Sequence, residues 1–494
     1  MLNSRTIEGL TGALDGLIGC IGGKHSDDNT ITALTADSRK VVPGSMFVAV
    51  KGYNTDGHKY IPQAVAAGAR AIIYEDTPPV TDENVIWIKV ADSAVALGRL
   101  ASHWYGNPSQ KLTLVGVTGT NGKTTIATLL YDLWRLAGRK AGLLSTVVNK
   151  IDSEEVPSTH TTPDPLELNA LLARMVDAGC SFAAMEVSSH AAAQHRIAGL
   201  HFRGGIFTNL TRDHLDYHKT FAAYLAAKKS FFDMLTPDAF ALTNADDRNG
   251  MIMLQNTGAG VKATYSVRSE ADFRVKVIED RLDGMTLAVR GHELETPFSG
   301  RFNASNLAAV FGAATLLGFT DTAELLRMMS LLTPVAGRFQ AFHSDSGITA
   351  IVDYAHTPDA LVNVLDTIAE TAPRDSRIIT VCGCGGNRDH GKRPVMAAEA
   401  ARRSDILVIT SDNPRDENPD DIIADMLAGL DEDQKQRTFT NTDRRQAIRT
   451  AAALAHPGDV ILVAGKGHET YQICAGVTSH FDDREEVRAA LGIN

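Results

Sequence analysis

Residues 115–125, VGVTGTNGKTT, combine the small and charged residue types that bind a phosphate group. The common phosphate-binding loop has the pattern G-x-x-x-x-G-K-[ST], in which backbone amides and a lysine surround the phosphate oxygens. Lys123 and Thr124 follow Gly122 as this pattern requires, but Val117 occupies the place of its first glycine. Lys123 would add a positive charge and Thr124 a hydroxyl for Mg²⁺. The sequence therefore predicts a variant phosphate-binding loop, and a glycine-rich turn without a ligand is the alternative.

The residues on either side of this loop predict the elements that must position it. Residues 112–118 form an apolar run typical of a buried strand, and apolar residues recur at helical spacing from Ile126 to Leu136. A strand, a tight turn and a helix place free backbone amides at a helix N-terminus, where the helix dipole favours an anion. We therefore expect the phosphate to be bound largely by backbone.

Glu186 is a carboxylate within the otherwise apolar strand 182–187. Burying a carboxylate without a partner is costly, so this side chain needs a cation or hydrogen-bond donors. Beside a phosphate-binding loop, Mg²⁺ is the simplest partner. A cap at the end of the strand is the alternative.

Two other patterns suggest different chemistry. Residues 149–152, NKID, match the N-K-x-D pattern by which GTPases read guanine, but they follow the first helix and one strand, too early for that fold. His214 and His218 have the i, i+4 spacing of zinc ligands on a helix, with His190 and His195 nearby in sequence. No zinc motif is complete, which disfavours a zinc hydrolase. The early position of NKID disfavours a GTP switch.

Several further apolar runs end in polar clusters, as strands of a parallel sheet do where they approach a ligand. These runs are 204–210, 240–245, 350–353, 377–383, 405–410 and 459–465, with helical stretches at 394–403 and 420–430. Another α/β unit precedes the loop and ends near residues 105–110. We predict an α/β protein of three domains, 1–107, 108–334 and 335–494, with a central P-loop ATPase-type parallel sheet and a Rossmann-like C-terminal domain.

The composition excludes several classes of protein. The net charge is −11 and there is no long basic run, which argues against nucleic acid and anionic membranes as partners. No apolar run approaches membrane-spanning length, and the N-terminus lacks a signal-peptide core. The five cysteines are few and odd in number, as is typical of reduced cytosolic thiols. We expect a cytoplasmic monomer that binds small molecules, without nucleic acid or membrane.

Six motifs together resemble the Mur ligases, which are ATP-dependent amide ligases of peptidoglycan precursor synthesis. They are GVTGTNGKTT, MEVSSH, TNLTRDHLDYH, FNASNLAAV, VDYAHTPD and AGKGHE, and they follow the family's order over nearly the whole chain. The family's own loop is G-T-N-G-K-T, which accounts for Val117. The segments TADSR, TTPDP and SDNPR resemble the branch that adds meso-diaminopimelate to UDP-N-acetylmuramoyl-L-alanyl-D-glutamate.

The resemblance implies a reaction with ATP and Mg²⁺, in which an acyl phosphate forms and an amine then attacks it. Sister ligases that add L-lysine, and folylpolyglutamate synthetase, are the nearest alternatives. A P-loop nucleotide switch is the alternative from another class. The long segment ahead of the loop counts against the folate enzyme.

The resemblance also implies roles for individual residues. It assigns catalysis to Lys123, Glu186, His214 and Lys228, the last as a carbamylated lysine, and Mg²⁺ to Thr124, Glu186, His214 and carbamylated Lys228. The implied ATP-binding residues are Gly119, Thr120, Asn121, Gly122, Lys123, Thr124, Thr125, Asn306, Arg338 and Asp353. The implied UDP-substrate residues are Ala36, Ser38, Tyr53, Asn54, Thr55, His160, Thr161, Thr162, Ser188, Gln194 and Arg196. The implied diaminopimelate residues are Arg388, Asp412, Asn413, Pro414, Arg415, Gly465 and Glu469.

Three of these positions carry additional expectations. Ala36 and His160 depart from a related enzyme, which has Leu and Asn there. A helical reading of residues 223–232 places Tyr224 and Lys228 on one face and Lys229 about 100° away. A solvated lysine pair is the alternative for this segment.

Overall fold

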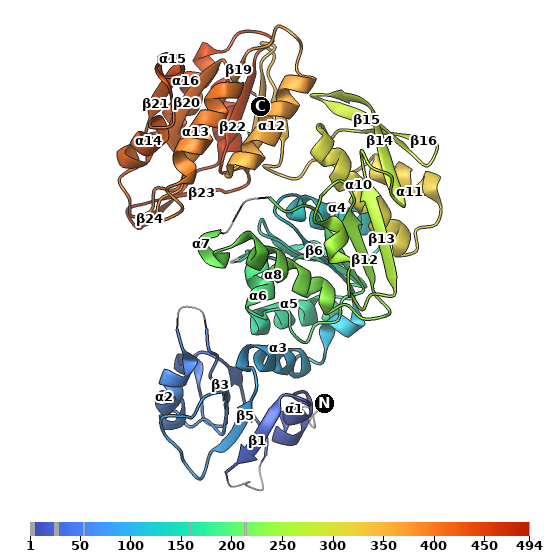
Figure 1. The fold of residues 1–494 in the computed structure, drawn as a ribbon, viewed down its shortest axis with the longest axis vertical. Helices are drawn as coiled ribbons and strands as arrows, with labels where there is room; N and C mark the ends of the chain where they lie inside the picture. Colours follow the sequence, from blue (N-terminus) through green and yellow to red (C-terminus); the bar gives the residue numbers. More distant parts are fainter. Residues whose placement is uncertain are drawn as a thin grey trace.

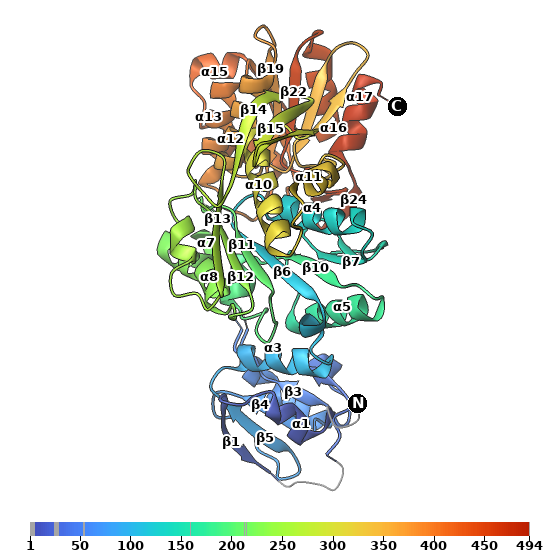
Figure 2. The same cartoon turned by 90° about the vertical axis from the view of Figure 1, so that its right-hand side faces the viewer.

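The computed structural model describes residues 5–23, 29–52, 55–158, 160–211, 213 and 215–493. Three large sheets follow one another along the chain and along the long axis of the molecule (Figures 1 and 2). The N-terminal sheet lies at one end, the C-terminal sheet at the other, and the largest sheet between them. This arrangement confirms the predicted α/β fold class.

The N-terminal sheet has five strands in the order β1-β5-β4-β3-β2, all parallel except for β1. Its strands are β1 (Ile18–Gly22), β2 (Leu34–Thr35), β3 (Met46–Val48), β4 (Ala71–Tyr74) and β5 (Ile86–Val90). Its helices are α1 (Ile7–Gly12), α2 (Ile61–Ala66) and α3 (Ser93–Trp104). Helix α3 packs against the central unit, where a Cβ on Gly98 would lie only 2.5 Å from the carbonyl oxygen of Ala198.

The central sheet has the order β16-β15-β14-β13-β12-β11-β6-β10-β7-β8-β9. The strands are β6 (Thr113–Thr118), β7 (Ala141–Leu144), β8 (Asn149–Ile151), β9 (Glu154–Val156), β10 (Phe182–Glu186), β11 (Gly204–Phe207), β12 (Phe240–Asn244), β13 (Val261–Ser266), β14 (Phe273–Arg281), β15 (Gly284–Val289) and β16 (His292–Thr296). The strands from β7 to β14 in this order are parallel, as predicted. Antiparallel strands β8–β9 and β15–β16 extend the sheet at both ends, which the sequence reading did not foresee.

Helices cover both faces of the central sheet, which is why β6 is apolar along its length. Val115 packs in the core that contains helix α4, whereas Leu114 points to the opposite core with helix α5. The helices of this unit are α4 (Lys123–Leu136), α5 (Pro165–Asp177), α6 (Ser189–Ala193), α7 (Leu215–His218), α8 (Phe221–Asp233), α9 (Gly250–Met253), α10 (Arg301–Leu316) and α11 (Thr322–Met329).

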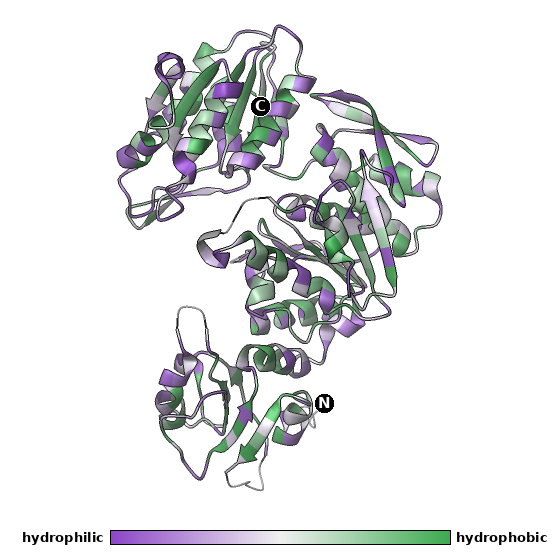
Figure 3. Ribbon diagram, viewed as in Figure 1, coloured by the Kyte–Doolittle hydropathy of each residue, from purple (hydrophilic) through white to green (hydrophobic). Residues whose placement is uncertain are grey.

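The C-terminal sheet has the order β17-β18-β22-β19-β20-β21, and only the β17–β18 pair is antiparallel. The strands are β17 (Gln340–His343), β18 (Thr349–Asp353), β19 (Ile378–Cys384), β20 (Ile406–Ser411), β21 (Thr438–Asn441) and β22 (Val460–Ala464), with a separate hairpin of β23 (Tyr471–Cys474) and β24 (Val477–His480). The helices are α12 (Pro358–Thr371), α13 (Lys392–Arg403), α14 (Pro419–Leu427), α15 (Glu432–Gln436), α16 (Arg444–Leu454) and α17 (Asp483–Leu491). The middle strands are hydrophobic throughout because helices cover both faces (Figure 3).

Helices long and apolar enough to cross a membrane are absent from the part of the chain that the structure describes.

Candidate active site

The predicted phosphate-binding loop connects β6 to α4 at the carboxyl edge of the central sheet. Gly119 and Gly122 both have positive φ, of 151° and 89°, and Gly122 caps helix α4. A Cβ on Gly119 would lie 1.8 Å from Thr208 Oγ1, and one on Gly122 would lie 2.6 Å from Asn306 Oδ1. Side chains larger than glycine are therefore excluded at both positions.

Val117 explains why the first glycine of the common pattern is not needed. It lies inside β6, fully buried, and pairs with Glu186 of β10. The strand therefore continues through the position where the common loop already turns. The loop itself is fixed by Asn209, whose Oδ1 accepts from the Asn121 amide at 2.9 Å and whose carbonyl accepts from the Thr120 amide at 2.8 Å.

A cavity of about 660 Å³ opens beside this loop and is lined by both the central and the C-terminal unit. The central unit contributes residues 119–125, Glu186 and Asn306, and the C-terminal unit contributes Arg338 and Asp353. The predicted ATP-binding residues thus line a single cavity. Its position at the carboxyl ends of parallel strands is the usual ligand position in α/β folds.

Two lysines, the half-buried Lys123 and the fully buried Lys228, line the cavity, although the protein as a whole is acidic. Lys123 Nζ donates to the carbonyl oxygens of Gly119 at 3.0 Å and Thr120 at 2.8 Å. Lys228 Nζ donates to the same Gly119 carbonyl at 2.7 Å, and the residue is 1% exposed. Burial lowers the pKa of Lys123, and burial together with the charge of Lys123 lowers the pKa of Lys228 well below its ordinary value.

The buried face of helix α8 distinguishes the two adjacent lysines. Tyr224 and Lys228 lie on this face, and the Lys228 ammonium is 4.6 Å from the centre of the Tyr224 ring. Lys229 points elsewhere and forms an ion pair with Asp233 on the same helix. Only Lys228 of the pair lines the cavity.

Glu186 ends β10 and is 1% exposed, and its Oε1 accepts from the Thr146 amide at 2.7 Å. Thr124 lies in the first turn of helix α4, and both it and Glu186 line the cavity. A buried carboxylate and a hydroxyl are oxygen donors of the kind that Mg²⁺ prefers. Clusters of three or more His, Cys, Asp or Glu side chains able to hold a metal are absent from the described residues. Predicted ligand His214 lies outside those residues.

The predicted muramoyl-peptide residues form one hydrogen-bonded network next to Glu186. Thr162 Oγ1 donates to the Glu186 carbonyl at 2.9 Å and accepts from the Ser188 amide at 3.2 Å. Arg196 Nη1 donates to the Thr162 carbonyl at 2.9 Å, and its Nε and Nη2 donate to Gln194 Oε1 at 3.0 and 2.7 Å. Thr161, which accepts from Thr146 at 3.1 Å, and Ser188 line the cavity.

The other predicted UDP-substrate residues that the structure describes are not among the residues that line the cavity. Ala36 and Ser38 belong to the N-terminal unit, where Ser38 Oγ donates to Gln63 Oε1 at 2.9 Å. Thr55 is exposed, and His160 is exposed beside the central unit. Predicted residues Tyr53 and Asn54 lie outside the described residues.

Arg338 connects the C-terminal unit to the loop, and Asp353 lines the same cavity. Arg338 Nη2 donates to Thr124 Oγ1 at 3.1 Å, and its guanidinium lies 4.5 Å from the centre of the Tyr354 ring. Asp353 ends β18, and its Oδ2 accepts from the Phe339 amide at 2.7 Å. Burial raises the pKa of Asp353 to about 6, although the charge of Arg338 acts in the opposite direction.

This raised pKa predicts a pH dependence of stability. Below pH 4 the Asp353 carboxyl is neutral in both the folded and the unfolded protein, and above pH 6 the fold must hold it ionised at a cost of about 3 kcal/mol. We therefore expect the free energy of unfolding of Asp353→Asn to increase relative to that of the wild type as the pH rises from 4 to 7. Urea unfolding across this pH range measures it, with the exposed Asp345→Asn as control. A difference that stays constant with pH would contradict the assignment.

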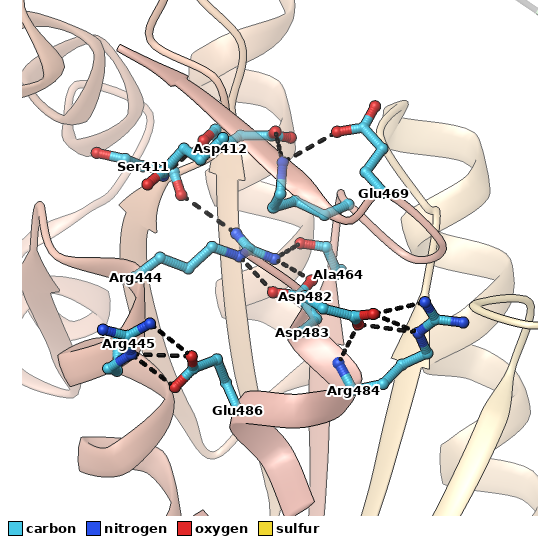
Figure 4. Close-up of polar contacts among 12 residues, drawn as sticks. Ser411, Asp412, Arg444, Arg445, Ala464, Glu469, Asp482, Asp483, Arg484 and Glu486 are labelled. Carbon is cyan, nitrogen blue, oxygen red and sulfur yellow. Dashed lines mark hydrogen bonds and ion pairs between the residues drawn. The ribbon is translucent and has the colours of Figure 1, made fainter. Parts of the chain in front are cut away.

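The predicted diaminopimelate residues form a second cluster at the carboxyl edge of the C-terminal sheet, outside the cavity lining, and Figure 4 shows two of them, Asp412 and Glu469. Asp412 and Asn413 follow β20, whereas Gly465 and Glu469 follow β22. Asn413 Nδ2 donates to Glu469 Oε2 at 2.9 Å, which joins the two loops. Pro414 is buried in the first of these loops.

Arg388 and Arg415 approach each other at Gly385. A Cβ on Gly385 would lie 2.9 Å from Arg415 Nη1 and 3.7 Å from Arg388 Cγ. Arg415 has a positive φ of 54°, and its amide donates to the Ile473 carbonyl of β23 at 3.0 Å. The hairpin therefore fixes the backbone of Arg415.

Three polar residues at these clusters were not assigned a role from the sequence. Asp213 and His356 line the cavity, and Lys466 is fully buried between the loops of the second cluster. Burial lowers the pKa of His356. The signal was present, because the quoted motifs TNLTRDHLDYH, VDYAHTPD and AGKGHE contain these residues.

The residues that suggested a GTP switch and those that suggested a zinc hydrolase have other roles in the fold. Asn149 lies within β8, fully buried, where its Oδ1 accepts from the Ser145 amide at 3.3 Å, away from the cavity lining. His218 Nε2 lies 2.9 Å from Ser189 Oγ, and His195 lies 3.7 Å from Asp92 of the N-terminal unit. The two histidines therefore have separate partners.

The fold and the site together define a class: a multi-domain α/β protein whose variant P-loop faces a second α/β unit across a cavity. Family models match the chain as the Mur ligase catalytic domain at residues 30–105, the Mur ligase middle domain at 117–314 and the Mur ligase glutamate ligase domain at 337–467. The chain belongs to the Mur ligase family, whose members are ATP-dependent amide-forming ligases. This confirms the resemblance seen in the six motifs.

Individual relatives match almost end to end. The chain is 59% identical over 468 residues to a UDP-N-acetylmuramoyl-L-alanyl-D-glutamate–2,6-diaminopimelate ligase of Bacteroides fragilis, covering 95% of this chain and 96% of that one. It is 60% identical over 463 residues to the ligase of the same name from Parabacteroides distasonis, covering 94% and 95%. A solved structure of a ligase with this name has a TM-score of 0.67 at 35% identity, covering 95% of this chain and 97% of that one.

Proposed function

We propose that this chain is the ATP-dependent ligase that adds meso-2,6-diaminopimelate to the D-glutamate carboxyl of UDP-N-acetylmuramoyl-L-alanyl-D-glutamate in peptidoglycan synthesis. The observation that carries the substrate choice is the approach of Arg388 and Arg415 at Gly385, within the chain of a Mur ligase. Diaminopimelate has a second carboxylate at the far end of its chain, and two guanidinium groups are suited to receive it.

The first step follows from the chemistry of amide formation. A carboxylate is a poor acyl donor, so its oxygen attacks the γ-phosphorus of ATP, giving an acyl phosphate and ADP. Such a transfer depends chiefly on positioning and charge neutralisation. Lys123 at the loop and Arg338 from the C-terminal unit supply positive charge at the cavity, and the amides of residues 119–125 supply donors.

In the second step the amine attacks the acyl carbon of this intermediate. The C–N bond forms through a tetrahedral intermediate, the amine loses a proton, and inorganic phosphate leaves with the C–O bond that breaks. Glu469 is suited to hold an ammonium group of the amino acid, and Asn413 and Asp412 add further polar contacts. A protein nucleophile is not needed.

Mg²⁺ would be held by Thr124, Glu186, His214 and carbamylated Lys228, and it would neutralise phosphoryl oxygens. Buried Glu186 and Thr124, which line one cavity, support this proposal. The lowered pKa of Lys228 supports carbamylation, because only a neutral amine attacks CO₂. The product is a carbamate and one released proton, so the position changes from a neutral amine to an anion.

Each of the three units would bind a different substrate. We assign the UDP-substrate to 1–107, with Ala36, Ser38 and residues 53–55, ATP to 108–334 and the amino acid to 335–494. We also propose that the enzyme acts in the cytoplasm as a monomer. All five cysteines are free, which is consistent with a reducing compartment.

Phosphate release tests the proposed function. With ATP and Mg²⁺ present, we expect sustained release only when both the UDP-linked dipeptide and meso-diaminopimelate are added. Release that needs neither would indicate a nucleotide switch, and release with L-lysine in place of diaminopimelate would indicate the lysine-adding sister enzyme. Release with a folate and glutamate would indicate folylpolyglutamate synthetase.

A further inference from the structure

Arg444 and Asp483 form an ion pair that is buried completely within the C-terminal unit (Figure 4). Arg444 begins helix α16, Asp483 begins helix α17, and both side chains are 0% exposed. The contact is bidentate, with Nε to Oδ1 and Nη2 to Oδ2 both at 2.7 Å. Although burial alone lowers the pKa of Arg444, the Asp483 carboxylate and the nearby Asp412 raise it above its ordinary value.

The remaining donors of Arg444 reach the ends of two strands. Nη2 donates to the carbonyl of Ala464, the last residue of β22, at 2.9 Å, and Nη1 donates to the carbonyl of Ser411, the last residue of β20, at 3.3 Å. These strands are not neighbours, because β19 lies between them. The guanidinium therefore bridges the two strand ends across the sheet edge.

This bridge lies where the sheet's own hydrogen bonding ends. The pairing of β19 with β22 stops at Val381 and Val463, whereas the pairing of β19 with β20 continues to Cys384 and Ser411. Ala464 still pairs with Asp353 of β18, but it is one residue beyond the ladder with β19, so on that side its carbonyl needs another donor. Arg444 supplies that donor.

The two loops that leave these strand ends are the loops that carry the predicted amino-acid residues. Asp412 directly follows Ser411, and Gly465 directly follows Ala464. A Cβ on Gly465, whose φ is 118°, would lie 2.9 Å from Asp412 Oδ2 and 4.0 Å from Arg444 Nη2. The backbone of one loop therefore packs directly against the carboxylate of the other, with the guanidinium beneath.

Lys466 completes the connection above the guanidinium. This fully buried ammonium lies 3.0 Å from Glu469 Oε2 and 3.8 Å from Asp412 Oδ1, and it donates to Asn413 Oδ1 at 3.2 Å. These contacts have the right geometry only if the two loops stay at a fixed separation. That separation is set at the strand ends that Arg444 holds.

We propose that Arg444, oriented by Asp483, is a positioning residue for the amino-acid substrate, because it fixes the distance between the loops at 412–415 and 465–469. The inference rests on the proposed function, in which these loops receive the incoming amine. It makes helix α17 part of the amino-acid site through Asp483, although Asp483 itself does not touch the substrate. Neither residue is a catalytic residue.

Two variants disturb the bridge in different ways. Arg444→Lys keeps the charge but cannot hold one carboxylate and two carbonyls at once. Asp483→Asn keeps the shape but loses the charge that orients the guanidinium. Arg445→Ala is the matched control, because Arg445 pairs at the surface with Glu486 of α17, 2.8 Å away, and so joins the same two helices.

Steady-state kinetics with each substrate varied in turn measures the effect. The wild type is first assayed with a panel of amino acids, and the variants are compared with the one that it ligates. We expect KM for this amino acid to rise roughly tenfold or more in both variants, since displacements of about 1 Å have effects of this size or larger. KM for ATP and for the UDP-linked substrate, and all constants of Arg445→Ala, should change less than about twofold.

A purely structural role predicts a different pattern. Misfolding would lower the active fraction and hence kcat, with all KM values unchanged, and thermal unfolding reports that loss separately. An unchanged amino-acid KM in folded Asp483→Asn or Arg444→Lys overturns the inference, as does an equal rise in Arg445→Ala. A wrong proposed function would give a different result, because the wild type would then ligate an amino acid other than diaminopimelate in the first panel.

Discussion

Replacement of Lys228 by alanine is expected to abolish ligation, with kcat falling by roughly two or more orders of magnitude. The buried position of Lys228 at the Gly119 carbonyl puts its side chain next to the phosphate-binding loop. In the proposed mechanism the carbamate supplies an anionic ligand for Mg²⁺ at this place, and alanine cannot. The rate of amino-acid-dependent phosphate release measures the loss.

Chemical rescue distinguishes a carbamate from an ordinary lysine. High bicarbonate should not restore Lys228→Ala, because the variant has no amine to react with CO₂. A short carboxylate such as acetate should partly restore it by occupying the vacated space. Intact-protein mass of the wild type under bicarbonate, without acid treatment, should show the added CO₂.

Lys229→Ala is the control for this prediction. Lys229 pairs with Asp233 on another face of α8, so its loss should leave the rate within about twofold of the wild type. Full activity of Lys228→Ala would remove Lys228 from the mechanism. Loss of activity in Lys229→Ala alone would mean that the neighbouring lysine carries the modification.

The phosphate-binding loop could be predicted from the sequence because its determinants are local. Gly119, Gly122 and Lys123 lie within five residues, and the strand before them and the helix after them have clear periodicities. The ends of most buried strands were predicted for the same reason, although β11 ends at Phe207 and not at residue 210. A long apolar run that stops at polar residues indicates a sheet edge without knowledge of the partner strands.

The antiparallel extension β14–β16 and the buried residue Arg444 were not predicted. Residues of β14 alternate between buried and exposed only in part, with a register shift between Val277 and Glu279, so periodicity is weak there. Arg444 stands next to Arg445 at a helix start, where an arginine pair normally indicates a solvated surface. Its burial depends on Asp483, which is distant in sequence, and local patterns carry no information about such a partner.

The grouping of the site residues was predicted only in part. Motif resemblance assigned Asp353 to the ATP group and Arg388 to the diaminopimelate group, without showing where either group lies or that the two are separate in space. The structure puts Asp353 at the cavity of the loop and Arg388 near Arg415 at Gly385. Sequence order does not encode this division, because it follows from the path of β18, β19 and β20 through the sheet.

The wild-type enzyme is expected to prefer meso-diaminopimelate to L-lysine by several kcal/mol in kcat/KM, and Arg415→Ala should lose most of this preference. Arg415 Nη1 donates to the Gly386 carbonyl at 2.8 Å, which orients the guanidinium beside Arg388. Lysine lacks the second carboxylate, so it would leave the arginine without its anion. The ratio of kcat/KM for the two amino acids measures the preference.

The choice of substitution matters because Arg415 has a φ of 54°. Alanine keeps the Cβ and so leaves the backbone strain unchanged, whereas glycine would relieve it and alter the loop. Arg415→Lys is the matched variant, since it keeps the charge but cannot form two parallel bonds to a carboxylate and should recover little of the preference. KM for ATP should stay near the wild-type value in both, because the cavity proposed to hold ATP is lined by other residues. Equal kcat/KM for lysine and diaminopimelate in the wild type would overturn the proposed substrate while leaving membership of the ligase family intact.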